Sequence, residues 1–268
     1  MTPPIIGSLY DHPNLYDVLF SDMNRSEMKF LTSLFERFGN QKETASIFEP
    51  ASGSGRLLFH LAKRGFDVSG LDLNPRAVAF CNRRLKRHGL KQFAVVGNMV
   101  SFSLADLGRT TKFAMAFNFV SSFLHLTTEA DARQHLRTIA EVLKPGGIYL
   151  LGIHLQPSGR QYCADESWSM RRGSLAVQSQ LKSLSQDFRK RIEMIEFCIE
   201  AETPTKRYKV LDRFPFRMYT AKQFGALLKA ADCFDLVETF SFDYDISRPI
   251  RVTADTEDVV FVLQSRRH

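Results

Sequence analysis

The stretch Ile47-Phe-Glu-Pro-Ala-Ser-Gly-Ser-Gly-Arg-Leu-Leu-Phe-His-Leu-Ala-Lys-Arg64 decides the fold of this chain. Its first residues are typical of a short buried strand and its last nine of a helix. The turn between them carries Gly53 and Gly55, which have no Cβ, so the backbone can bend sharply and a ligand can approach it closely. The helix that follows directs its free N–H groups at whatever lies on the turn. The stretch therefore predicts a ligand-binding strand–turn–helix unit.

Two details of this stretch restrict the class of ligand that the turn can bind. A dinucleotide-binding turn needs a third small residue three positions after the second glycine, but that position is Leu58. Glu49 ends the strand, where a carboxylate would repel a pyrophosphate and attract a cationic group. The pattern Glu-x-x-x-Gly-x-Gly therefore fits a cofactor with adenosine at one end and an ammonium group at the other.

At these residues the chain resembles the class I S-adenosylmethionine-dependent methyltransferases. Taken alone, Gly-x-Gly can also be a purely structural turn. The resemblance implies an α/β, Rossmann-like fold, in which a mostly parallel seven-stranded sheet has helices on both faces. It also implies S-adenosylmethionine as the cofactor and no metal site.

Later motifs follow in the order of that family. Asp72 ends a second strand seventeen residues after Gly55, about where an acidic residue accepts ribose hydroxyls. A helix cap is the alternative role. After the third strand the family usually has an Asp that receives the adenine amino group; here Asn98 keeps an acceptor oxygen and adds a donor. Met99 is expected to pack on the adenine face.

The run 113–117 is continuously apolar, which is typical of a strand covered on both faces. The segment 118–126 resembles methyltransferases that act on small amines, amino sugars or acids. The resemblance places the backbone of residues 117–118 beside the transferring methyl group. The cofactor-binding residues that it implies are Glu49, Ala51, Gly53, Gly55, Asp72, Leu73, Asn98, Met99, Phe117 and Asn118.

Two residues are candidates for catalysis. His125 has an imidazole that titrates near pH 6.5 when unperturbed, so it can take a proton from an amine acceptor. Its alternative is a hydrogen-bonded residue lining the cleft. Tyr16 lies in the N-terminal segment that related small-molecule enzymes use as a lid, where its hydroxyl could orient the acceptor. Its alternative is an ordinary packing residue.

The polar texture of residues 156–219 predicts a small antiparallel sheet that covers the acceptor site. A homodimer interface is its competing role. We expect 1–44 to form an N-terminal lid and helix, and 45–155 with 220–268 the cofactor-binding core. Residues 144–147, Lys-Pro-Gly-Gly, predict a turn before a strand over 148–154. The residues expected to line the acceptor pocket are Trp168, Arg171, Arg172, Arg213, Phe216 and Arg217.

Composition supports a soluble cytoplasmic enzyme. Hydrophobic residues make up 44% of the 268 residues, and no apolar run is long enough to span a membrane. No signal peptide is expected. The dispersed cysteines Cys81, Cys163, Cys198 and Cys233 favour a reducing compartment. The net charge is +7, with basic runs over 189–191 and, longer, over 83–88. That run is explained by a helix C-terminus, so a nucleic-acid partner is not favoured.

Together these features predict a methyltransferase (EC 2.1.1.-) that moves a methyl group to a nitrogen or oxygen of a small-molecule acceptor. An RNA or protein methyltransferase that uses the basic surface is one alternative. A cofactor-binding regulator without turnover is the other.

Overall fold

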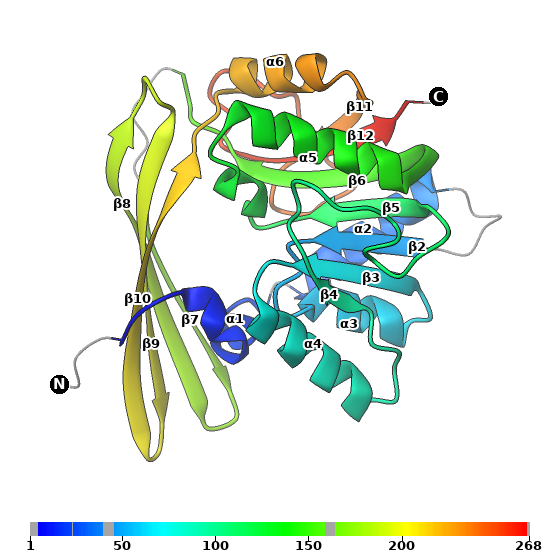
Figure 1. The fold of residues 1–268 in the computed structure, drawn as a ribbon. Helices are drawn as coiled ribbons and strands as arrows, with labels where there is room; N and C mark the ends of the chain where they lie inside the picture. The colour runs from blue at the N-terminus through cyan, green and yellow to red at the C-terminus, as the bar shows by residue number, and fades with distance from the viewer. Residues whose placement is uncertain (1–4, 23, 40–45, 159–163, 267–268) are drawn as a thin grey trace.

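The computed structural model describes residues 5–22, 24–39, 46–158 and 164–266. Two sheets and their helices make up the described chain (Figure 1). The elements in order are β1 (Ile5–Ile6), η1 (Leu9–Asp11), α1 (Pro13–Leu19), α2 (Asn24–Phe38), β2 (Ser46–Pro50), α3 (Arg56–Lys63), β3 (Asp67–Asp72), α4 (Pro75–Arg87), β4 (Ala94–Val96), β5 (Phe113–Asn118), η2 (Ser122–His125), α5 (Glu129–Val142), β6 (Leu143–His154), β7 (Asp165–Arg172), β8 (Leu175–Asp187), β9 (Ile192–Thr203), β10 (Lys206–Arg217), α6 (Ala221–Ala231), β11 (Phe234–Phe240) and β12 (Asp258–Ser265). None of the described helices has the length and apolarity that a membrane span requires.

The larger sheet has seven strands in the order β11-β12-β6-β5-β2-β3-β4. Its strands pair in parallel from β4 to β6, whereas β12 runs antiparallel to both of its neighbours. The chain reverses its winding direction between β2 and β5, so the carboxyl ends of β2, β3 and β5 border one crevice. In such folds ligands bind in that crevice. The predicted seven-stranded, mostly parallel sheet is confirmed.

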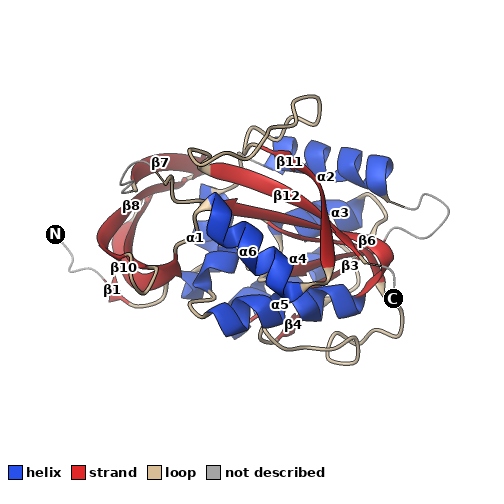
Figure 2. Cartoon of the chain, turned by 90° about the horizontal axis from the view of Figure 1, so that it is seen from above, coloured by secondary structure: helices blue, strands red, loops and turns tan. Residues whose placement is uncertain are grey.

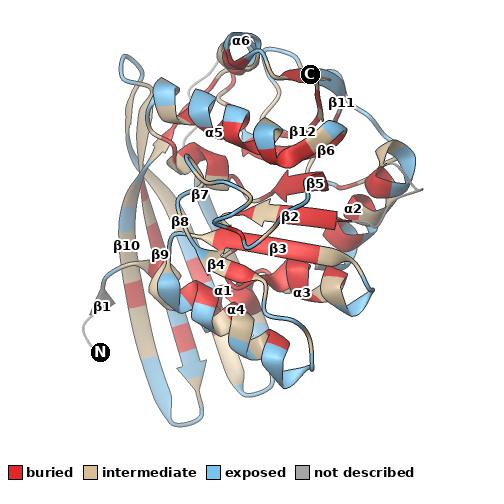
Figure 3. Cartoon of the chain, turned by 45° about the vertical axis from the view of Figure 1, so that its right-hand side comes forward, coloured by how far each residue is buried: buried red, intermediate tan, exposed pale blue. Residues whose placement is uncertain are grey.

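Helices cover both faces of this sheet (Figure 2). Successive strand residues point to opposite faces; Phe48 packs in the core beneath α5 and α6, whereas Ile47 packs in the core beneath α2 and α3. The burial colouring of Figure 3 shows that the central strands are mostly buried. The two cores hold the glycine turn between rigid layers.

The second sheet is built mainly from the antiparallel strands β7 to β10, in the order β1-β10-β9-β8-β7. The predicted antiparallel insertion is thus confirmed, although β7 was not expected. Its sequence Asp-Glu-Ser-Trp-Ser-Met-Arg-Arg is mostly exposed and lacks the apolar alternation that signals a strand. The two-residue β1 joins the sheet by pairing in parallel with β10.

The start of β6 corrects one expectation. Residues 144–147 do not form a turn ahead of the strand; they lie inside β6, which begins at Leu143 directly after α5. Between the pairs Phe113–Leu143 and Met115–Ile148 the register with β5 shifts, so the extra residues form an irregularity. Gly146, with φ +73°, takes the left-handed conformation there.

The N-terminal segment packs against the second sheet rather than against the main core. Leu15, Val18 and Leu19 of α1 are buried with Phe197 and Ile199 of β9. This contact places η1 and α1 between the two sheets, above the carboxyl ends of β2 and β3.

Candidate functional site

The glycine turn closes on itself at the end of β2. The N–H of Gly55 donates to the carbonyl of Ser52 at 2.8 Å, and the N–H of Ser52 donates to the carbonyl of Leu71 at 2.9 Å. Gly53 and Gly55 have φ values of +54° and +65°, which L side chains rarely adopt. A Cβ on Gly55 would also lie 2.2 Å from Sγ of Cys81. Gly55 is therefore required by packing, and Gly53 by backbone conformation alone.

Asp72 joins the ends of β3 and the glycine turn. Its Oδ2 accepts from the N–H of Gly53 at 2.7 Å, and its Oδ1 accepts from the N–H of Asn74 at 2.8 Å. Burial raises the pKa of this carboxyl above its ordinary value, although the two backbone donors oppose that shift. The helix cap that was the alternative role for Asp72 is made by Asn74 instead, since its side chain accepts from the N–H groups of Arg76 and Ala77.

Glu49 is the unusual carboxylate of the site. Its Oε2 is buried and has no hydrogen-bond partner in the described structure. Burial raises the pKa of Glu49 well above its ordinary value, and nearby Arg56 offsets only part of this. Arg56 is itself paired with buried Glu27 through two hydrogen bonds. A buried unpaired carboxylate is costly, so a bound cation here would be stabilised.

Asp17 ties the N-terminal segment to three other elements. Its Oδ1 accepts from Oγ of Ser54 at 2.9 Å and from Arg84 at 2.7 Å, and its Oδ2 accepts from Arg172 at 2.7 Å. Burial alone would raise the pKa of Asp17, but Arg84 and Arg172 hold it below its ordinary value. One carboxylate therefore connects α1 with the glycine turn, α4 and β7.

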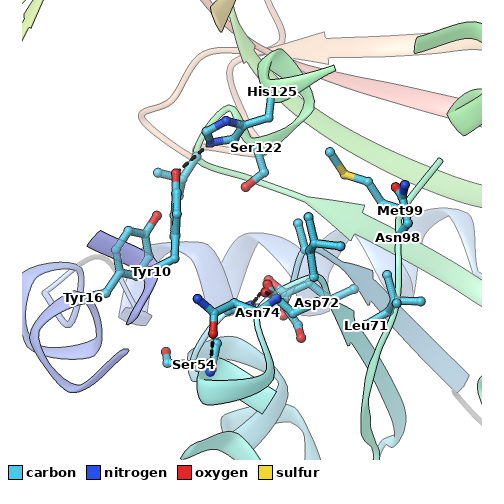
Figure 4. A pocket seen from close by; sticks show the side chains of 18 of the residues that line it. Tyr10, Tyr16, Ser54, Leu71, Asp72, Asn74, Asn98, Met99, Ser122 and His125 are labelled. Carbon is cyan, nitrogen blue, oxygen red and sulfur yellow. Dashed lines mark hydrogen bonds between the residues drawn. The ribbon is translucent and has the colours of Figure 1, made fainter. Parts of the chain in front are cut away.

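Tyr10 and His125 meet at the top of the cavity, where the Tyr10 hydroxyl lies 2.7 Å from Nε2 of His125 (Figure 4). The rings of Phe214 and Phe216 pack around the imidazole, with centroids 5.0 and 4.7 Å away. Burial lowers the pKa of His125 to about 4 and raises that of Tyr10 well above its ordinary value. Both groups are therefore neutral at pH 7.

These parts enclose a cavity of about 710 Å³ between the N-terminal segment and the carboxyl ends of the strands. In Figure 4, Tyr10 and Tyr16 lie on one side of it, and Asn98 and Met99 on the other. Most of the expected site residues line it, namely Tyr16, Glu49, Ala51, Gly53, Asp72, Leu73, Asn98, Met99 and His125.

Three expected cofactor residues do not line the cavity. Gly55 lies beneath the turn as the N-cap of α3. Phe117 is fully buried in the core shared with α2 and α3. Asn118 is buried as well, and its side-chain N–H donates to the carbonyl of Pro50 at 3.1 Å. The cavity wall at this point is formed instead by Phe119 and Val120.

The turn after β4 is fixed from below by α5. The Oδ1 of Asn98 accepts from the N–H of Val100 at 2.9 Å. The carbonyl of Met99 lies 2.8 Å from Nδ1 of buried His135, whose Nε2 lies 2.8 Å from the Tyr149 hydroxyl. The carbonyl can only accept, so Nδ1 carries the proton and Nε2 accepts from Tyr149.

Sequence reasoning missed Tyr10, Asn74 and Asp212 as lining residues, and misplaced the arginines. Neither Trp168 nor any arginine expected in the acceptor pocket lines the cavity. Arg172, Arg213 and Arg217 instead pair with Asp17, Glu196 and Glu129, respectively. Cys81, Cys198 and Cys233 are free thiols, and Cys163 lies outside the described residues. Over the described ranges, no three His, Cys, Asp or Glu side chains are grouped to hold a metal.

Comparison with known proteins finds similarity to methyltransferases in the core of the chain. The model of the methyltransferase domain family matches residues 47–147. A dTDP-3-amino-3,4,6-trideoxy-alpha-D-glucopyranose N,N-dimethyltransferase of Streptomyces venezuelae is 27% identical over 142 residues, or 53% of this chain and 56% of that protein. The chain spans about half the length of the curated relatives it matches.

Solved structures extend the likeness of fold to most of the chain. Streptomyces venezuelae DesVI has a TM-score of 0.72 at 20% identity, covering 93% of this chain and 97% of its own. CalS10, an amino pentose methyltransferase of Micromonospora echinaspora solved with S-adenosylmethionine bound, has a TM-score of 0.64 at 20% identity, covering 89% and 90%. The predicted Rossmann-like methyltransferase fold is confirmed.

Proposed function

We propose that this chain is an S-adenosylmethionine-dependent enzyme that methylates a small-molecule acceptor, because the model of the methyltransferase domain family matches residues 47–147 and the fold resembles that of DesVI. The acceptor atom is a nitrogen or an oxygen. The amino-sugar and amino-pentose enzymes among the similar proteins favour nitrogen.

The observation that carries this proposal is the unpartnered Oε2 of Glu49 beside the glycine turn. The α-ammonium group of S-adenosylmethionine would give that oxygen a charged donor and remove the cost of burying it alone. A nucleotide pyrophosphate at the same place would lie against a carboxylate oxygen that has no hydrogen-bond donor, and the two would repel each other. The residues present therefore fit this cofactor.

The other cofactor contacts follow from the same end of the sheet. Each oxygen of Asp72 accepts one backbone N–H and retains a lone pair for a ribose hydroxyl. Asn98 and Met99 line the opposite wall, where the adenine would lie. Gly53 leaves the turn open, because nothing lies within 4 Å of the position that its Cβ would take.

The bound cofactor would supply an electrophilic methyl group on a sulfonium. The protein's part is to hold the acceptor in line with that group and to receive a proton. The acceptor nitrogen can give its proton to the Tyr10 oxygen while Tyr10 gives its own hydroxyl proton to Nε2 of His125. The Tyr10 oxygen and Nε2 of His125 share a 2.7 Å hydrogen bond, which makes this transfer possible. The low pKa of His125 keeps the imidazole in the accepting form at pH 7.

We also infer that residues 1–44 and 156–219 serve the acceptor, and that 45–155 with 220–268 serve the cofactor. Tyr10, Tyr16, Asp212 and Phe214 line the cavity from the first two segments.

Calorimetry tests the proposal. Titration of the whole chain with S-adenosylmethionine and with S-adenosylhomocysteine is expected to show one site. Glu49→Gln keeps the shape of the side chain, removes its charge, and is expected to weaken both ligands by roughly tenfold or more. Glu141→Gln, on an exposed face of α5, is the matched control. No binding to the wild-type chain, or equal binding by Glu49→Gln, would overturn the assignment.

A further inference from the structure

The cavity has the opposite charge to the rest of the protein. The chain has a net charge of +7, with 36 lysines and arginines. Among the lining residues, the carboxylates are Glu49, Asp72, Asp131 and Asp212, and the one guanidinium is Arg56. Arg56 already forms a two-bond pair with Glu27, so it has little charge to offer a ligand. The protein is basic overall, but the lining of this cavity is acidic.

The positive charges nearest to the acceptor side are neutralised by other carboxylates. Arg217 pairs with Glu129 while also donating to the carbonyl of Thr127 at 2.6 Å. Arg213, the residue next to Asp212, pairs with Glu196 at 2.6 Å. No lysine lines the cavity in the part of the chain that the structure describes. A phosphate group inside this cavity would therefore lack a cation to bind it.

Three of the four carboxylates have other roles. Glu49 and Asp72 lie at the cofactor end, beside the glycine turn. Asp131 accepts from the Thr128 hydroxyl at 2.6 Å, as part of the cap of α5. Asp212 is the carboxylate that remains for the acceptor.

Asp212 lies where the N-terminal segment meets β10. Its Oδ2 accepts from the N–H of Leu9 at 2.8 Å, and no cation among the described residues forms an ion pair with it. It lies close enough to Tyr10 for its charge to raise the pKa of that phenol, after the larger effect of burial. The rings of Tyr10 and Phe214, whose centroids are 6.2 Å apart, belong to the same wall. A carboxylate beside aromatic rings is a favourable environment for an ammonium group.

We propose that the acceptor enters this cavity as an ammonium ion held by Asp212, and that it carries no phosphate within the cavity. The inference rests on the proposed function and specifies its substrate class. Asp212 holds the amine beside Tyr10, whose hydroxyl leads to His125. The dTDP-sugar enzyme that the chain resembles is named for an acceptor with a diphosphate; this cavity favours a free amine instead.

The test uses ligand-observed NMR with the whole chain saturated with S-adenosylhomocysteine. The first probe is the amine methyl 3-amino-3-deoxy-glucopyranoside, which is compared with its hydroxyl analogue methyl glucopyranoside and with its own 6-phosphate. Twenty further amines are tested in the same way, each against its hydroxyl analogue and a phosphorylated form. Amines are expected to bind at least roughly tenfold more tightly than their partners. Asp212→Asn keeps an acceptor for the N–H of Leu9 and removes the charge, so it should lose this preference. Glu200→Gln, exposed on β9, should keep it.

The inference is wrong if no amine binds more tightly than its hydroxyl analogue, or if a phosphorylated form binds more tightly than the amine itself. It is also wrong if Asp212→Asn still prefers amines to their hydroxyl analogues. Calorimetry on the same samples distinguishes failure of the proposed substrate class from failure of the proposed function. Cofactor binding without amine preference overturns only the substrate class. Absence of cofactor binding overturns the proposed function, and the substrate class with it.

Discussion

The hydroxyl of Tyr10 lies 2.7 Å from Nε2 of His125, although the two residues are 115 positions apart in the chain. The contact connects the segment over the cavity with the turn that follows β5. It also gives the catalytic candidate His125 a hydrogen-bonded partner, Tyr10, that the sequence did not indicate.

Tyr10→Phe tests this pair. It keeps the ring against Phe214 and removes only the hydroxyl, so cofactor affinity should be unchanged while turnover of an amine acceptor falls by roughly tenfold to a hundredfold. Tyr208→Phe is the control, since Tyr208 does not line the cavity. The measurement is kcat and the pH profile of methyl transfer, with cofactor affinity from calorimetry. Unchanged turnover would show that the pair moves no proton.

Asp17→Asn should loosen the N-terminal segment. The variant leaves Arg84 and Arg172 without their buried counter-charge, for a loss of about 2–3 kcal/mol in the free energy of unfolding. Urea denaturation measures this loss, and proteolysis within residues 5–22 should become faster. Asp106→Asn, at an exposed loop, should change neither. Wild-type stability in Asp17→Asn would mean that the apolar contacts of α1 hold the segment alone.

Gly53 and Gly55 should respond differently to alanine. Gly53→Ala meets no atom within 4 Å, so the positive φ alone should cost about 1–2 kcal/mol. Gly55→Ala adds an overlap with Sγ of Cys81 and should cost roughly 3 kcal/mol or more. Removing the sulfur in a Gly55→Ala/Cys81→Ala double variant should recover part of that loss. Thermal or urea unfolding of the wild type, Gly55→Ala, Cys81→Ala and the double variant forms a double-mutant cycle. Additive effects would exclude the overlap as the cause.

Two buried imidazoles predict a loss of stability in mild acid. Burial lowers the pKa of both His125 and His135 to about 4, against about 6.5 in an unfolded chain. The unfolded state therefore binds more protons between these values, and the free energy of unfolding falls as pH drops from 6.5 towards 4, on the order of 3 kcal/mol per imidazole.

His135→Gln isolates one of these contributions. It should reduce the slope of stability against pH in urea denaturation between pH 4.5 and 7. It should also lower stability at pH 7, because the carbonyl of Met99 loses its donor. His88→Gln, at the exposed end of α4, should keep the wild-type slope. An unchanged slope in His135→Gln would mean that this imidazole does not titrate on unfolding.

The end of the cavity at the glycine turn was predictable because its sequence signals are local. Glu49, Gly53 and Asp72 lie at strand ends, and parallel strands bring such ends to one edge without any knowledge of side-chain packing. Tyr10 and Asp212 were not predictable. Their partners, His125 and Leu9, are fixed only when the second sheet folds against the N-terminal segment.

The arginines show why charge alone misleads. From the sequence, Arg172, Arg213 and Arg217 were expected to line the acceptor pocket. Each is paired with a carboxylate from another element, namely Asp17, Glu196 and Glu129, and no spacing rule announces such pairs. The early start of β6 was missed for a similar reason, because pairing with β5 overrides the turn tendency of Pro145 and Gly146.

The pairing of β1 with β10 limits how the second sheet can be exchanged between related proteins. One wall of the cavity is built from two segments that are distant in the sequence, which are joined by strand pairing and by the hydrogen bond from Leu9 to Asp212. In a chimera that takes only residues 165–217 from a related protein, the N-terminal segment would not match the β10 strand with which it has to pair. A chimera designed to change which acceptor is bound would therefore need the N-terminal segment and the second sheet from the same protein.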